Sequence, residues 1–281
     1  MAHIYILLKD MQVSHANLSS SYLTLDYPQN ALLGFAHNIA RFLSKNQTSK
    51  LSYIKNKVKL GQERAFVILK HFEYDRGYVS LAGHLNENSH KALNIPMNPP
   101  EITGTLTQTV VLSLYVKQTP DQALIAKFLL FNRFAGGDIA NTQIQIFEDD
   151  NEIREQLKME KGWLIQEATH ELVNKAKKTD YSTAFSDYLA TFTLEEKKGE
   201  KTHQRHHKGW YFASLAGYQL LEQPKERHGA RYGHKHAFAE PIIGLHKLEY
   251  FKNQDPDSLF WHNELNGSTY HITQKGIEDE Y

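Results

Sequence analysis

The first residues of the chain alternate between apolar and other side chains, as the residues of a β-strand do. Ile4, Ile6 and Leu8 fall on one face and predict a strand over residues 3–9. From about residue 30 the apolar residues recur at helical spacing and predict an amphipathic helix. The stretch between them, "SHANLSSSYLTLDYPQ", shows no period. Strand-to-helix connections usually take roughly 2–6 residues, so the sequence predicts an overlong polar connection with a function of its own.

Three further stretches before residue 150 favour strands, because they alternate or are rich in β-branched residues. They are "ERAFVILKHFEY" (63–74), "TLTQTVVLSLYVKQ" (105–118) and "TQIQIFED" (142–149). A helix is predicted between the last two, with Thr119 as N-cap, Pro120 at the first helical position, and Gly136 and Gly137 after its end. The resulting order, βαββαβ, is that of a ferredoxin-like fold, the fold of the RNA-recognition motif (RRM-like).

After residue 150 the sequence pattern changes first to that of helices and then back to that of strands. Residues 150–193 are predicted to be helical, including the segment "WLIQEATHELVNKAKK", and a polar basic loop follows. Strand patterns return over 209–222 and 241–251, and Asn266-Gly267 predicts a tight hairpin. We therefore expect an α+β protein with a ferredoxin-like core (1–149), a helical insertion and basic loop (150–208) and a β-rich C-terminal part (209–281), packed as one compact unit.

Composition narrows the possible functions. The chain has 281 residues, 41% of them hydrophobic and 23% charged, as in ordinary globular proteins. It has no cysteine, which excludes disulfides, thiolate zinc sites and a cysteine nucleophile and suits a reducing compartment. No apolar run is long enough for a signal peptide or a membrane span, so a cytoplasmic protein without membrane contact is expected.

The charges balance overall, with 32 Lys and Arg against 32 Asp and Glu. Proteins that bind nucleic acid without specificity are normally basic overall, so a polyanion would have to bind a local patch. Between Lys197 and His236 there are nine Lys and Arg, three Glu and six His. Arg227, Arg231 and His236 are the candidates there, and a solvated loop is the alternative.

Catalytic and metal motifs are absent from the sequence. The serines at 19–21 lack the glycine-flanked turn that holds a hydrolase nucleophile. The histidine-rich stretches "HQRHH" (203–207) and "HGARYGHKH" (228–236) lack the helical spacing of a zinc protease. We therefore predict no metal and no cofactor. The aromatic octapeptide of RNA-recognition motifs is also missing, so base stacking on an open sheet is not predicted.

Two segments could instead bind phosphate or ribose. Gly136 and Gly137 could expose backbone N–H groups as an anion nest beside Arg133, although the local sequence alone favours a plain helix C-cap. In the overlong connection, small residues permit close approach, and His15, Asn17, Ser19 and Ser20 supply polar groups for phosphate, ribose and base edges.

The same connection carries a family resemblance. "SHANLSSSYLTLDYPQNALLGFAHNIARFL" resembles the opening signature of the Cas-five-like subunit of type I-F CRISPR surveillance complexes, the Csy-two family, with its "AN", serines, Leu-Thr, proline and "GF-x-H" in order. Further similar segments follow in the family's order over almost the whole chain. They are "NRFAGGDI" (132–139), "GWLI" (162–165), "AGYQLLEQPKERHGAR" (216–231) and "HAFAEPIIGLHKLEY" (236–250).

The resemblance implies a non-catalytic, RNA-binding subunit of an antiviral defence complex (Cascade, here the Csy complex). Such a subunit grips the 5′ handle of the CRISPR RNA (crRNA), pairs with the large subunit (Cas-eight-like, Csy-one) and caps the filament of Cas-seven-like (Csy-three) backbone subunits. Target DNA near the protospacer-adjacent motif is a further candidate contact. The expected RNA-binding residues are His15, Asn17, Ser19, Ser20, Arg133, Gly136, Gly137, Arg227, Arg231 and His236.

The alternative is an enzyme. Some Cas-five-like proteins of other subtypes cleave precursor crRNA without metal by general acid–base catalysis. His15 or His37, together with Tyr22, could take those roles here.

Overall fold

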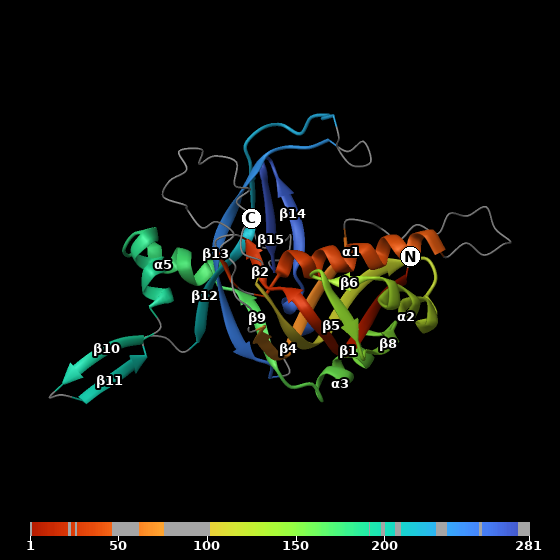
Figure 1. Ribbon diagram of the computed structural model, residues 1–281, viewed down its shortest axis with the longest axis horizontal. Coiled ribbons are helices and arrows are strands. Elements are labelled where there is room, and N and C mark those ends of the chain that lie inside the picture. Colours follow the sequence, from red (N-terminus) through yellow and green to blue (C-terminus); the bar gives the residue numbers. More distant parts are fainter. Residues whose placement is uncertain are drawn as a thin grey trace, which may run out of the picture.

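Among the residues that the structure describes, eleven strands form one curled antiparallel sheet (Figure 1). The structure is a computed structural model, and it describes residues 2–21, 24–25, 27–46, 62–75, 102–190, 192–197, 200–205, 209–228, 235–252 and 255–274. The order of the strands along the sheet is β14-β15-β12-β13-β9-β4-β5-β1-β7-β6, and β8 pairs with another part of β1. The fold is therefore mixed α/β, as predicted.

The N-terminal part supplies one end of this sheet and two helices. Its elements are β1 (Ala2–Asn17), β2 (Ser19–Ser21), β3 (Thr24–Leu25), α1 (Gln29–Asn46), β4 (Arg64–Tyr74), β5 (Thr103–Val116), α2 (Gln122–Phe131), β6 (Arg133–Phe134), β7 (Gly137–Ala140) and β8 (Gln143–Phe147). Within the sheet, β4, β5, β1 and β8 are consecutive neighbours, and each pair is antiparallel. Helix α1 lies between β1 and β4 in the chain, and α2 lies between β5 and β8.

Both faces of this part of the sheet are covered. Successive side chains of a strand point to opposite faces, yet every residue of β1 from Ile4 to Leu8 is buried. On one face Tyr5 contacts Phe260 from the C-terminal part, with ring centroids 6.0 Å apart. The helices pack together through Phe35 and Phe128, whose centroids are 5.6 Å apart. The core therefore joins residues from both ends of the chain.

The second part of the chain completes the sheet and adds three short helices. Its elements are α3 (Asp150–Leu157), β9 (Trp163–Glu167), α4 (Thr169–Ala176), α5 (Tyr181–Leu189), β10 (Phe192–Lys197), β11 (Glu200–Arg205), β12 (Trp210–Leu220), β13 (Ala239–Tyr250), the 3-10 helix η2 (Pro256–Leu259), β14 (His262–Asn266) and β15 (Thr269–Thr273). Helices α4 and α5 pack on β12 and β13 through a small separate cluster that includes Leu172 and Leu245. The predicted tight hairpin is present as β14 and β15, with a positive φ of 59° at Gly267.

Strand β9 is the join between the two halves of the sheet. It pairs with β13 along its whole length but with β4 at only two positions, Ile68 with Leu164 and Leu69 with Trp163. The segment around it was predicted to be helical, and that prediction is wrong for residues 163–167. The basic loop prediction is also wrong in part, because residues 192–197 and 200–205 pair as a β-hairpin.

The start of α2 also differs from its prediction. Its N-cap is Asp121, whose Oδ1 accepts a hydrogen bond from the Ala123 N–H at 2.9 Å. Thr119 lies further upstream, and its hydroxyl instead donates to Glu148. The carboxylate of Asp121 meets the exposed N–H groups of the first turn, which is the physical requirement of a cap.

A buried carboxylate connects side chains of the three strands β1, β4 and β5. Glu160 follows α3, and its side chain is only 1% exposed. It forms ion pairs with Lys9 of β1 at 2.9 Å and with Lys70 of β4 at 2.7 Å, and it accepts a hydrogen bond from the Thr109 hydroxyl at 3.0 Å. Burial alone would raise the pKa of Glu160, but the two lysines outweigh it and lower that pKa. Glu160 is therefore ionised at neutral pH.

Candidate nucleic-acid interface

The end of β1 carries a bulge that turns His15 outward. The pairing of β1 with β5 changes register between Val13 and Ala16, and His15 has a positive φ of 55°. An extra residue in one strand of a ladder re-aims the side chains around it. The His15 side chain is consequently 75% exposed, whereas the neighbouring Ala16 is buried.

Asp75 and Thr103 hold the His15 ring in place. His15 Nδ1 lies 3.0 Å from Asp75 Oδ2, and the same oxygen accepts a hydrogen bond from the Thr103 hydroxyl at 2.7 Å. The Thr103 hydroxyl lowers the pKa of Asp75, slight burial opposes this, and the His15 ring lowers it further. Asp75 is thus an ionised anchor, and it orients the imidazole rather than covering it.

Gly136 lies in a hairpin turn with Ala135, and Gly137 begins β7, so neither glycine ends a helix. Helix α2 ends at Phe131, and β6 and β7 follow as a short hairpin in which Phe134 pairs with Gly137. Ala135 and Gly136 both have positive φ, 48° and 80°, as a turn between two paired strands requires. The C-cap interpretation is therefore wrong, and an anion nest at this turn stays a prediction.

The bulge and the turn lie against each other. Ser14 of β1 pairs with Asp138 of β7, and the Asn17 N–H donates to the Ala135 carbonyl at 2.8 Å. The approach is close enough to require glycine: a Cβ on Gly137 would lie 2.5 Å from the Ser14 carbonyl oxygen and 2.7 Å from the Ala16 nitrogen. The structure thus brings together five of the predicted residues. We call this set, His15, Asn17, Arg133, Gly136 and Gly137, the bulge–turn surface.

Arg133 supplies the cation of the bulge–turn surface. Its side chain is 67% exposed, with Nε 3.3 Å from Asp138 Oδ1 and one terminal nitrogen donating to the Gly136 carbonyl at 3.4 Å. An exposed ion pair of this kind contributes only about 0–1 kcal/mol. A stronger anion such as a phosphate group can therefore replace Asp138 as the partner of Arg133 at little cost.

The predicted overlong connection is not a structureless loop. Residues up to Asn17 continue β1, and Ser19–Ser21 pair with Thr24–Leu25 as a small hairpin. Ser19 and Ser20 are therefore in β2, and their side chains lie outside the described residues. Leu18 and Tyr27, on either side of the hairpin, are buried, so the connection is anchored in the core at both ends.

The other basic candidates that the structure describes, Arg227 and His236, lie on a projecting arm at the ends of β12 and β13. Lys225 and His236 pair across this arm in a backbone bridge. Glu222 faces the basic residues: its Oε2 lies 2.7 Å from Lys225 Nζ, and its Oε1 contacts Arg227. The guanidinium of Arg227 also stacks over the Phe238 ring, 4.3 Å from its centroid. Arg231 lies outside the described residues.

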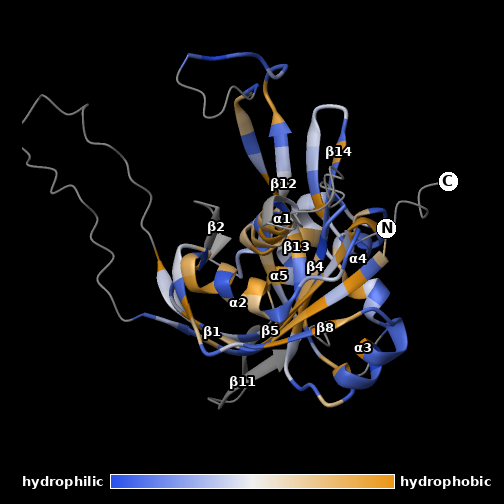
Figure 2. Cartoon of the chain, turned by 90° about the vertical axis from the view of Figure 1, so that its right-hand side faces the viewer, coloured by the Kyte–Doolittle hydropathy of each residue, from blue (hydrophilic) through white to orange (hydrophobic). Residues whose placement is uncertain are grey.

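Glu222 offsets part of the positive charge of the arm. The Lys225 ammonium, and then the Phe238 N–H, lower the pKa of Glu222 to about 2, so this carboxylate is ionised at neutral pH. The arm projects away from the body of the protein in both views (Figures 1 and 2). The structure therefore places seven of the predicted residues at two separate places: five at the bulge–turn surface on the body, and Arg227 and His236 on the arm.

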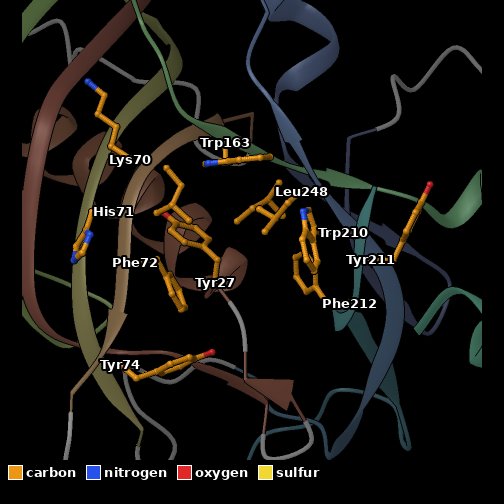
Figure 3. Close-up of a pocket in the computed structure, with 12 residues that line it drawn as sticks. Tyr27, Lys70, His71, Phe72, Tyr74, Trp163, Trp210, Tyr211, Phe212 and Leu248 are labelled. Carbon is orange, nitrogen blue, oxygen red and sulfur yellow. The ribbon is translucent and has the colours of Figure 1, made fainter. Parts of the chain in front are cut away.

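One hollow of the protein was not predicted from the sequence. It is a cavity of about 640 Å³ (Figure 3). We call it the aromatic cavity, and it is lined by Tyr27, Leu69, Lys70, His71, Phe72, Tyr74, Trp163, Ile165, Trp210, Tyr211, Phe212 and Leu248. Several of its rings are well exposed, among them Tyr74 (43%), Trp163 (42%) and Trp210 (46%). Exposed rings of this size facing a concave surface mark a binding site more often than a packing defect.

The cavity arises where the two halves of the sheet diverge. Strand β4 pairs with β9 only up to Leu69, and its last residues, including Phe72 and Tyr74, continue past the beginning of β9. Strand β12, with Trp210 and Phe212, lies on the far side of β13. A signal for this site existed in the sequence, because Phe72 and Tyr74, like Trp210 and Phe212, are aromatic residues two positions apart and so share a strand face. No single contiguous motif of the sequence contains these rings, because they come from separate strands.

Among the described residues, no three histidine, aspartate or glutamate side chains are grouped closely enough to hold a metal ion. No described helix combines the length and the apolar character needed to cross a membrane.

Comparison with known proteins identifies one family. The model of the family "CRISPR-associated protein (Cas_Csy2)" matches residues 6–272. No curated protein matches the chain. The matched range includes the bulge of β1 and the β12–β13 arm.

Proposed function

The chain belongs to the Csy2 family of CRISPR-associated proteins, subunits of the type I-F CRISPR complex, and we propose that it is the non-catalytic subunit that grips the 5′ handle of the crRNA. In this proposal it contacts the RNA backbone and positions it for the rest of the complex. The four-stranded segment β4-β5-β1-β8 with α1 and α2 would be the ferredoxin-like, RRM-like core of the family.

The observation that carries this proposal is the bulge–turn surface. Segments that are far apart in the sequence meet there, held by the Asn17–Ala135 hydrogen bond and the close approach at Gly137. They present an exposed imidazole on β1 and an exposed guanidinium on β6, with β7 between them, together with small residues and a glycine turn. Phosphate contacts from Arg and from backbone N–H groups fix the register of a nucleic-acid chain, and small residues let that chain approach closely.

Docking to neighbouring subunits is the second element of the proposal. We propose that the large subunit (Csy-one) and the Cas-seven-like backbone subunit (Csy-three) cover apolar surface of this chain. Leu130 and Phe131, adjacent at the end of α2, are 77% and 74% exposed. Such side chains on an isolated chain are expected where another protein packs against it.

The test is RNA binding by an Arg133→Gln variant at several salt concentrations. Loss of one phosphate contact should weaken binding of handle RNA and lower the slope of log K against log salt by about 0.7. Arg154→Gln is the matched control, because Arg154 on α3 is also paired, with Asp255 at 2.8 Å. It lies near the opposite end of β1, roughly 30 Å of strand away. Unchanged affinity and slope in Arg133→Gln would remove the bulge–turn surface from the proposal.

The same RNA, resolved on a gel after incubation, tests the catalytic alternative. His15 Nδ1 contacts Asp75, an arrangement that also orients a general base, so a metal-independent endoribonuclease is the second candidate. We expect repeat RNA to stay intact in the presence of chelator. Specific cleavage that disappears in His15→Ala would replace the proposed function with this one.

A further inference from the structure

We propose that the aromatic cavity holds an unstacked base of single-stranded RNA. This inference deepens the proposed function and rests on it, because it takes RNA as the ligand of this chain. It concerns different residues from the bulge–turn surface, so the two can fail separately.

The walls of the aromatic cavity have the composition of a stacking site. Phe72 and Tyr74 come from β4 on one side, and Trp210 and Phe212 from β12 on the other, with Tyr27 between them (Figure 3). Phe72 and Tyr74 already meet edge to face, with centroids 5.2 Å apart. Aromatic rings bind bases of single strands through their π-faces, with little dependence on sequence.

The charge around the aromatic cavity favours a base over a phosphate. Among its described lining residues there is no carboxylate, and the ionisable groups besides tyrosines are Lys70 and His71. Lys70 is already held by Glu160, at 2.7 Å, and by Asp10. The cavity is therefore close to neutral, as expected for a site that takes an uncharged ring and leaves the phosphates to other residues.

The chain itself connects the aromatic cavity with the bulge–turn surface. The segment that follows Asn17 forms β2 and β3, which contact β12, and then delivers Tyr27 to the cavity wall. One short stretch of chain thus borders both places. An RNA strand whose phosphates lie at the bulge–turn surface could turn one base into the cavity, which is how single-stranded RNA is usually read.

Tryptophan fluorescence of the full chain tests the proposal directly. Two of the three tryptophans, Trp163 and Trp210, line the cavity, and Trp261 is completely buried elsewhere. Short oligo(rU) and oligo(rA) should quench the emission, and an abasic ribose-phosphate oligomer of equal length should not. Equal binding and equal quenching by the abasic oligomer would overturn the proposal.

Substitutions give the second measurement. Phe72→Leu and Phe212→Leu should each weaken RNA binding by about 5- to 150-fold, since each removes one stacking ring. Phe72→Tyr should restore binding, which separates loss of the ring from loss of folding. Tyr181→Leu is the matched control, because it removes a ring that is 53% exposed on α5, away from the cavity.

The outcomes separate the two proposals. If Arg133→Gln weakens binding and the Phe72 and Phe212 variants bind like the parent, the cavity proposal is wrong and the proposed function stands. If no RNA binds at all, both fail. If added partner subunits change the tryptophan fluorescence while RNA does not, the cavity is a protein-docking site and the proposal is overturned.

Discussion

The buried carboxylate of Glu160 should be a main determinant of the stability of this fold. We consider Glu160→Gln, which keeps the shape of the side chain and removes its charge. In the parent, the Nζ atoms of Lys9 and Lys70 lie 2.9 Å and 2.7 Å from the carboxylate oxygens of Glu160. In the variant both ammonium groups face a neutral amide instead. Removing one partner of a buried ion pair generally costs about 3–5 kcal/mol, because the remaining charge stays desolvated.

The exposure of the two lysines reduces that figure here. Their side chains are 23% and 22% exposed, so each retains some water, and Lys70 keeps Asp10 as a second partner. We therefore expect the free energy of unfolding to fall by about 2–3 kcal/mol at neutral pH. Glu155→Gln is the matched control. Glu155 is 69% exposed, and its contact with Lys158 should contribute only about 0–1 kcal/mol.

The pH dependence gives a second, independent measure. The pKa of Glu160 is lowered in the folded state, below its ordinary value of 4.5. Its contribution to stability is thus fully present above pH 4.5 and is lost as the pH falls through the folded-state pKa. Urea unfolding followed by circular dichroism should show a difference in the free energy of unfolding between parent and Glu160→Gln at pH 7, and this difference should become smaller in acid. A difference no larger than that of Glu155→Gln, or one that does not depend on pH, would refute this reasoning.

Two further predictions concern the turn and the arm. Gly137→Ala should lower the free energy of unfolding by about 1–3 kcal/mol, because the added Cβ would meet the β1 backbone. Gly34→Ala, in helix α1 with no atom within 4 Å of the added Cβ, should instead raise the free energy of unfolding by about 0.5–1 kcal/mol. Thermal unfolding of both variants tests this pair of predictions. Glu222→Gln removes the carboxylate that faces Lys225 and Arg227, so if the arm contacts RNA, affinity for handle RNA should rise and its salt dependence steepen; identical binding isotherms would place the arm outside the RNA site.

The sequence predicted strands and helices well where one face of an element dominates its pattern. The α1 helix follows from apolar residues at helical spacing, and their side chains are buried. Strand β1 was recognised only over its first part, because beyond Leu8 the ladder contains two residues with positive φ, Asp10 and His15. Such bulges interrupt the alternation on which the prediction depended.

Tertiary pairing decided the elements that were predicted wrongly. Residues 163–167 merge in sequence with a helical pattern, and only pairing with β13 and β4 makes them a strand. The two glycines after α2 fit a helix end by sequence, but the helix ends at Phe131 and Gly136 lies in a hairpin turn. Short apolar runs and glycine pairs fit several local structures equally well, and contacts distant in sequence select among them.

The candidate site was predictable only in part, because contacts distant in sequence decide which of its residues meet. His15, Asn17 and Arg133 were found from residue type, and their meeting at one surface came from the pairing of β1 with β7. The aromatic cavity takes its rings from β4, β9 and β12, which no local pattern connects.

The narrow join at β9 has a mechanical consequence. Only two residue pairs connect β9 with β4. The Trp261 side chain adds one hydrogen bond at this join, from its Nε1 to the Ile165 carbonyl of β9 at 3.2 Å. The opposite walls of the aromatic cavity belong to the two sides of this join. A force applied to the arm of β12 and β13 would therefore act on this narrow join, and it would change the spacing of the rings before it disturbed the packed interior.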